Sequence, residues 1–134
     1  MAAINDPIAD FLTRIRNAAK AQHRYVEVSW SKIKQNIAEI LKEQGFIESF
    51  LIKQENNHRG VIRLYLKYTE GRHSAIKGIK RASKPGLRRY VGHQDIPCFY
   101  GGYGLSILST SLGVMAGAEA INKKVGGELL CLVW

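Results

Sequence analysis

The stretch that decides the fold runs from Phe46 to Tyr68 and reads FIESFLIKQENNHRGVIRLYLKY. Its two ends, 46–53 and 61–68, are rich in aromatic and β-branched residues, which favour strands. The turn residues between these ends are Asn56, Asn57 and Gly60. Because side chains alternate along a strand, one face of the second strand carries Ile62, Leu64, Leu66 and Tyr68. The pattern therefore predicts a β-hairpin with one buried face.

Helical patterns precede this hairpin. Asp6 can cap a helix, and an apolar stripe with helical spacing then predicts that helix over 7–20. Ser31 is placed to cap a second apolar stripe, which Gly45 ends. A short strand is expected between the two helices, over 25–28. These elements give the order helix–strand–helix–strand–strand, which is an α+β arrangement.

The pattern changes near residue 71, where the sequence has turn residues and no periodic apolar pattern. We therefore predict an α+β fold of two small α/β modules, residues 1–70 and residues 71–134. The second module is strand-rich with one short helix. Its expected strands cover 76–82, 87–91, 105–108 and 128–134, and its helix covers 117–124. The Pro85-Gly86 pair favours a type II turn between the first two of these strands.

Charge is distributed unevenly along the 134 residues. The chain has 20 Lys and Arg against 11 Asp and Glu, a net charge of +9. Residues 51–94 hold 11 of the basic and 2 of the acidic side chains, so the whole excess lies there. A concentrated basic block predicts a polyanionic partner, and nucleic acid is the commonest. A membrane surface would require a basic amphipathic helix, and a membrane span would require an apolar run that the sequence lacks. We therefore expect no membrane partner.

Signals of enzyme chemistry are weak. The four histidines have no metal-ligand spacing, and the possible serine nucleophiles lack a Gly-x-Ser-x-Gly elbow or an obvious base. Cys98 and Cys131 are too few for a disulfide framework and are expected to be reduced thiols. We expect no catalysis, no metal, no cofactor and no small-molecule substrate.

The basic block itself is typical of an RNA-binding surface. From Arg72 to Arg89 it has seven basic residues and no acidic residue, and Tyr90, Tyr100 and Tyr103 follow. Cations beside aromatic rings suit phosphate binding combined with base stacking. A merely solvated basic face is the alternative. The run Ser109–Ser111 adds hydroxyls that can reach base edges, although a turn that ends a strand explains them equally well.

Several motifs in order along the chain resemble the bacterial S-eight family of small-subunit ribosomal proteins. The opening DPIAD with LTRIRNA (6–10, 12–18) and LKEQGFI (41–47) resembles the family's N-terminal part. SKPGLRRY (83–90) is similar to its central motif, and GLSILSTS followed by GVM (104–111, 113–115) to its RNA-binding loop. VGGELLCLVW (125–134) is similar to its C-terminal strand.

The resemblance implies two docked α/β modules that bind a stem in the central domain of small-subunit ribosomal RNA early in assembly. It also implies a protein neighbour of the S-five family and a place in the cytoplasmic ribosome, with a bacterial-type organellar ribosome left open. Phosphate contacts are expected from Arg14, Arg72, Lys77, Lys80, Lys84, Arg88 and Arg89. More specific contacts are expected from Tyr90, Ser109, Thr110, Ser111 and Glu128. The motifs add Ser83, Pro85, Gly86, Gly113 and Gly127 to the expected RNA site.

The sequence departs from the family at two places. Leu112 stands where the family usually has Lys, and 116–118 reads Ala-Gly-Ala where a helix cap and charged residues are usual. Two other functions were weighed. An RNA-processing enzyme would need carboxylates in the C-terminal half, where Asp95, Glu119 and Glu128 come from separate elements. A DNA-binding regulator would need a recognition helix with polar readers, and none is evident.

Overall fold

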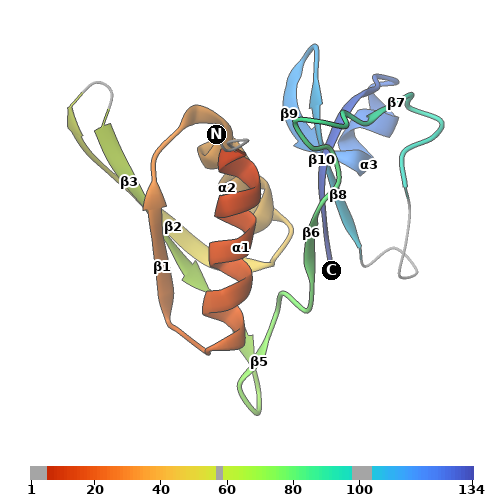
Figure 1. Cartoon of the computed structure of the whole chain (residues 1–134). Coiled ribbons are helices and arrows are strands. Elements are labelled where there is room, and N and C mark those ends of the chain that lie inside the picture. The colour runs from red at the N-terminus through yellow and green to blue at the C-terminus, as the bar shows by residue number, and fades with distance from the viewer. Residues whose placement is uncertain (1–5, 57–58, 98–103) are drawn as a thin grey trace. The chain divides into compact units, whose positions relative to one another are not determined.

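The computed structural model describes residues 6–56, 59–97 and 104–134 (Figure 1). Its elements are α1 (Pro7–Lys20), β1 (Tyr25–Ser29), α2 (Lys32–Glu43), β2 (Ile47–Asn56), β3 (Arg59–Leu66), β4 (Tyr68–Thr69), β5 (His73–Ser74), β6 (Ile79–Arg81), β7 (Tyr90–Val91), β8 (Leu105–Thr110), β9 (Gly113–Ala116), α3 (Gly117–Asn122) and β10 (Gly127–Val133). The predicted α+β class is confirmed. The chain forms two compact units, one of Thr13–Lys77 and one of Gly78–Trp134 together with the residues up to Leu12.

In the Thr13–Lys77 unit, antiparallel strands form a sheet in the order β1-β3-β2. The predicted hairpin is confirmed as β2 and β3, and Ile62, Leu64 and Leu66 are buried as its alternation required. The strands extend further into the connection than predicted. Gly60 pairs with Gln54 inside the ladder instead of turning the chain, and Asn57 lies outside the described residues. Tyr68 belongs to β4 rather than to the hairpin.

Both N-terminal helices follow their predicted caps. One carboxylate oxygen of Asp6 accepts a hydrogen bond from the Ala9 N–H at 3.2 Å, and α1 begins at the next residue, Pro7. The Ser31 hydroxyl accepts from the Lys34 N–H at 3.3 Å and starts α2. Gly45 follows α2 with a φ of 80°, a backbone conformation that glycine adopts without strain.

The other unit is built around β10. Its sheet runs in the order β6-β10-β8-β9, and β7 also pairs with β10. The predicted burial of the last strand on both faces is confirmed at Leu129, Leu130 and Cys131. A β-bulge between Leu129 and Cys131 shifts the register against β8. Under this sheet Ile96, Leu108, Met115, Ala120 and Leu129 form an apolar cluster.

Several predicted boundaries in this unit need correction. The strands expected over 76–82 and 87–91 shrink to β6 and β7, because their pairing with β10 covers only those residues. In the turn between them, Lys84 and Leu87 exchange backbone hydrogen bonds of 3.0 and 2.9 Å. Gly86 lacks the positive φ that a type II turn requires at this position, so the predicted turn type is wrong.

The largest difference between the predicted and the observed strands lies after residue 108. The strand expected over 105–108 continues to Thr110 as β8, and β9 returns beside it as an unanticipated hairpin. β9 is only four residues long and begins with glycine, so its sequence carries little strand signal. In the described part of the chain, no helix has the length and apolar character needed to cross a membrane.

Candidate nucleic-acid interface

The register of β10 brings three predicted site residues into one row. Glu128 lies opposite Tyr90 of β7 on one side and opposite Ser109 of β8 on the other. Directly opposed residues on neighbouring strands project to the same face of a sheet. Residues from three separate motifs therefore share one face, with the Tyr90 side chain at one end and 70% exposed.

Glycine is needed where β10 enters this row. A Cβ atom on Gly127 would lie 2.1 Å from the carbonyl oxygen of Ser109, and one on Gly126 would lie 2.4 Å from that of Val91. Both distances are far below a van der Waals contact, so any side chain at either position would push β8 or β7 away. Gly127 thus belongs to the site as the residue that permits the close approach of its strands.

Residues 83–89 form a basic loop that is closed at its base by Ser83. The Ser83 N–H donates to the Leu129 carbonyl at 3.0 Å, and the Leu129 N–H donates to the Arg89 carbonyl at 2.9 Å. The Ser83 hydroxyl, which is fully buried, accepts from the Arg89 N–H at 3.1 Å. Ser83 therefore holds the two ends of the basic loop together on β10.

The basic loop presents most of its side chains to solvent. Its exposed members are Lys84, Gly86, Leu87, Arg88 and Arg89, and Pro85 is half-buried. A Cβ atom on Gly86 would meet nothing within 4 Å, so open space lies at the tip of the loop. The exposed cations can bind phosphates without a large loss of solvation.

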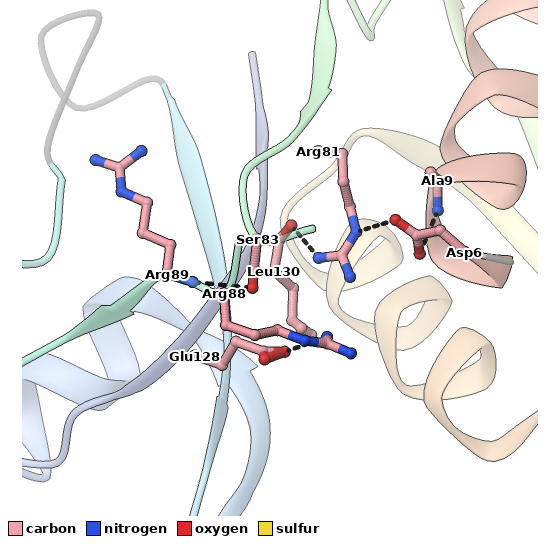
Figure 2. A network of polar contacts seen from close by, with 8 residues as sticks. All are labelled: Asp6, Ala9, Arg81, Ser83, Arg88, Arg89, Glu128 and Leu130. Carbon is pink, nitrogen blue, oxygen red and sulfur yellow. Dashed lines mark hydrogen bonds and ion pairs between the residues drawn. The ribbon is translucent and has the colours of Figure 1, made fainter. Parts of the chain in front are cut away.

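Arg88 and Glu128 link the basic loop to the row. Arg88 Nη1 donates to Glu128 Oε1 at 3.4 Å, and the two side chains are 48% and 16% exposed. Figure 2 shows the Arg88 side chain extended beside Glu128, whereas the Arg89 side chain points the opposite way. The contact therefore joins the basic loop to the row and leaves about half of the Arg88 side chain accessible.

The hydroxyl run lies partly in a strand and partly at a hairpin tip. Ser109 and Thr110 end β8, and Ser111 and Leu112 form the exposed turn to β9. The Thr110 hydroxyl accepts from the Leu112 N–H at 3.1 Å and donates to the Gly113 carbonyl at 2.8 Å. Gly113 has a φ of 116°, which other residues rarely adopt. Thr110 and Gly113 thus shape the tip, and Ser111 is displayed on it.

Arg81 belongs to the basic block by sequence but does not share its exposure. Its side chain is only 7% exposed. Its Nε donates to Asp6 Oδ2 at 3.1 Å, and its Nη1 donates to the Leu130 carbonyl at 2.7 Å (Figure 2). The signal was present in the sequence, because Arg81 stands two residues after buried Ile79 and so shares its face.

The remaining predicted cations are divided between the two units. Lys80 is exposed on β6, in the same unit as the basic loop. Arg14, Arg72 and Lys77 are exposed residues of the Thr13–Lys77 unit. Of the aromatic residues noted with the basic block, Tyr100 and Tyr103 lie outside the described residues. The structure therefore groups the 80–90 and 109–128 motifs and keeps these three cations in a separate unit.

Metal and thiol chemistry find no support in the described ranges. No group of three or more His, Cys, Asp or Glu side chains gathers there in a way that could hold a metal ion. Cys131 is a buried free cysteine, and burial raises the pKa of its thiol to about 12. Such a thiol is almost entirely protonated at neutral pH and a poor nucleophile. Cys98 lies outside the described residues.

Comparison with known proteins identifies the family. The model of the family "Ribosomal protein S8" matches residues 6–134. The small ribosomal subunit protein uS8 of Protochlamydia amoebophila is 68% identical over 131 residues, which cover 98% of each chain. Those of Roseiflexus castenholzii (56% identical; 98% of this chain and 99% of the relative) and Chlamydia felis (49% identical; all of both chains) are also similar. The resemblance seen in the sequence is confirmed, and the chain belongs to the ribosomal protein S8 family, a structural constituent of the small ribosomal subunit.

Proposed function

We propose that this chain binds directly to a stem in the central domain of small-subunit ribosomal RNA and helps that region to assemble. One observation supports this above all others. The exposed cations of the basic loop, the row of Tyr90, Glu128 and Ser109, and the tip with Ser111 belong to one compact unit. Cations, an exposed ring and neutral hydroxyls together suit an irregular RNA stem, where phosphates and unstacked bases are both accessible.

Each class of residue has its own role in this proposal. Lys80, Lys84, Arg88 and Arg89 bind phosphates, and Tyr90 stacks on a base that the irregular stem leaves unpaired. Ser111 and Ser109 donate to or accept from base edges and 2′-hydroxyl groups. The supporting residues of this site are Ser83, Pro85, Gly86, Thr110, Gly113, Gly127 and Glu128.

Arg14, Arg72 and Lys77 add phosphate contacts from the Thr13–Lys77 unit in this proposal. Residues 71–134 carry most of the contact, and the compact unit that holds Gly78–Trp134 also includes the residues up to Leu12. Asp6, the ion-pair partner of buried Arg81, lies before residue 71. Point variants of the whole chain are therefore the sound way to assign contacts, because a fragment that starts at residue 71 lacks that partner.

The geometry favours this function over the two alternatives. An RNA-processing enzyme would need clustered carboxylates, yet Glu128 pairs with Arg88 and Glu119 pairs with Lys123 at 3.0 Å. A DNA-binding regulator would need a helix that enters the major groove, and α3, the helix within Gly78–Trp134, has only six residues. We propose neither catalysis nor duplex DNA binding.

Footprinting the purified protein on full-length small-subunit ribosomal RNA tests the proposal. We expect protection of one irregular stem in the central domain, with Lys84→Ala weakening that protection at moderate salt. A regular RNA duplex and a DNA duplex of equal length serve as competitors and should displace the stem poorly. Protection scattered over the RNA, or equal competition by DNA, would contradict the proposal, and Mg²⁺-dependent cleavage of the stem would favour the enzyme. The expected protein neighbour is a member of the S-five family.

A further inference from the structure

One face of the β1-β3-β2 sheet is exposed, although its opposite face is buried. The register places Tyr25 opposite Tyr65 and Glu27 opposite Arg63, and it places Leu51 opposite Arg63 and Lys53 opposite Val61. Directly opposed residues share a face. We call this surface the open face, and its members are Tyr25, Glu27, Leu51, Lys53, Arg63 and Tyr65.

The centre of the open face is a cluster of side chains in mutual contact. Arg63 Nη2 lies 3.1 Å from Glu27 Oε1, and the Arg63 guanidinium lies 4.5 Å from the centre of the Tyr25 ring. The Tyr25 and Tyr65 rings are 6.0 Å apart and tilted by 57°. A hydrogen bond with Tyr65 is the main cause that raises the pKa of Arg63; burial lowers it, and the hydrogen bond and charge of Glu27 raise it further. Side chains that are already held in place lose little entropy when a partner binds.

The composition of the open face is that of a binding hot spot. Tyr25 is 42% exposed and Leu51 is 54% exposed, which makes them two of the chain's large exposed apolar side chains. Tyrosine and arginine are, together with tryptophan, the residue types enriched among residues that dominate protein–protein binding energies. Exposed apolar side chains beside a tyrosine and an arginine are typical of an interaction surface.

Charge decides which class of partner fits. The Arg63 cation is balanced by Glu27, whose side chain is 44% exposed and whose carboxylate would repel phosphates. The Tyr25 ring is covered on one side by Arg63 and is a poor platform for stacked bases. The basic loop, by comparison, presents several exposed cations together. The open face therefore suits a protein better than RNA. Lys53, which is exposed on the same face, favours an acidic group on that protein.

We propose that the open face docks a neighbouring protein of the small ribosomal subunit, which presents aliphatic side chains to Leu51 and Tyr25 and a carboxylate to Lys53. This inference rests on membership of the ribosomal family and is independent of the RNA site proposed above. The contact contributes to incorporation only when other proteins are present.

Competitive assembly tests the inference with Leu51→Asp. Isotope-labelled wild-type and variant proteins compete for limiting ribosomal RNA, either alone or with the other small-subunit proteins of the same organism. Gln54→Asp is the matched control, because it adds the same carboxylate to the same strand at an exposed position of opposite parity. Leu51→Ser is a second variant, and thermal melting verifies that all three proteins fold.

We expect Leu51→Asp to compete equally on naked RNA and to fall at least about fivefold behind wild type in the complete mixture. Gln54→Asp should compete equally in both. Equal competition of Leu51→Asp in the complete mixture would overturn the inference, and an equal loss on naked RNA would assign the open face to RNA instead. Failure of wild type to bind naked RNA would contradict the proposed RNA function and leave the comparison in the complete mixture valid.

Discussion

The ion pair between Arg88 and Glu128 allows a prediction that distinguishes two roles of the carboxylate. The two roles predict changes of opposite sign in RNA affinity when the carboxylate is removed. Glu128 either orients Arg88 toward RNA or competes with phosphate for it. The structure favours orientation, because the contact is a single 3.4 Å bond and Arg88 remains 48% exposed. The perturbation is Glu128→Gln, which keeps the size of the side chain and removes its charge.

The expected magnitude follows from side-chain entropy. Ordering a long arginine side chain costs up to about 2 kcal/mol, and an ion pair that already restricts the side chain removes part of that penalty. We therefore expect Glu128→Gln to weaken binding of the cognate stem by about 1 kcal/mol, roughly fivefold. The slope of log affinity against log salt should not change, because the number of phosphate contacts is the same. The free energy of unfolding should fall by less than about 1 kcal/mol, as is usual when a partly exposed ion pair is broken.

The assay is a salt series of binding measurements on wild type, Glu128→Gln, Arg88→Ala and the double variant. Arg88→Ala removes one phosphate contact and should reduce the slope by about 0.7–0.9. The double variant should bind like Arg88→Ala, because Glu128 acts through Arg88. Glu119→Gln is the control, since it breaks an exposed ion pair with Lys123 in the same unit. Tighter binding of Glu128→Gln with a steeper slope would refute the orienting role.

Three further predictions concern single side chains. Lys84→Ala should reduce the salt slope by about 0.7–0.9 at an unchanged melting temperature, and an unchanged slope would mean that this cation is only solvated. Ser111→Ala should weaken cognate binding by about 1–3 kcal/mol at constant slope and stability, whereas Thr110→Val should lower the melting temperature because its hydroxyl closes the hairpin tip. A lower melting temperature for Ser111→Ala, together with weaker RNA binding for Thr110→Val, would contradict these roles. In a Cys98→Ser protein, Cys131 should resist a thiol reagent at pH 8 until unfolding, since burial raises its pKa to about 12; rapid reaction of the folded protein would contradict this.

The N-terminal elements could be predicted from the sequence because their signals are local. α1 and α2 each combine a capping side chain, Asp6 or Ser31, with an apolar stripe several turns long. The hairpin from β2 to β3 alternates over enough residues to define its buried face. Such patterns survive in the structure because local preference and tertiary packing agree.

The elements that sequence reasoning missed depend on partners far along the chain. Arg81 is held by Asp6, which is 75 residues away, and by the carbonyl of Leu130. Strand alternation places Arg81 on the buried face of Ile79, but no local pattern reveals which distant residues bind it. β9 is short and forms a strand because β8 continues to Thr110 and offers an edge to pair with. Both features therefore depend on long-range partners, and the intrinsic strand propensity of β9 is too weak to predict it.

The candidate site shows the same division. Its members, such as Tyr90, Ser109 and Glu128, were found as separate motifs with plausible chemistry. Their gathering into one row depends on the register of β10, which includes a bulge after Leu129. A shift by one residue would turn every side chain of that strand to the other face. Sequence motifs therefore predicted the individual residues of the site, but only the strand register shows that these residues lie side by side.

Charge is the feature whose meaning changes most between sequence and structure. Along the chain, the excess lies within residues 51–94, which suggested that the C-terminal module carries most of the positive charge. In space, the Thr13–Lys77 unit has 13 Lys and Arg against 6 Asp and Glu, and the rest of the chain has 7 against 5. Long-range attraction to a polyanion follows net charge, so it comes mainly from the Thr13–Lys77 unit. In the proposed function, the preference for one stem rests on the short-range contacts of Tyr90, Ser109 and Ser111 rather than on net charge, so Ser111→Ala tests it better than the loss of any one cation.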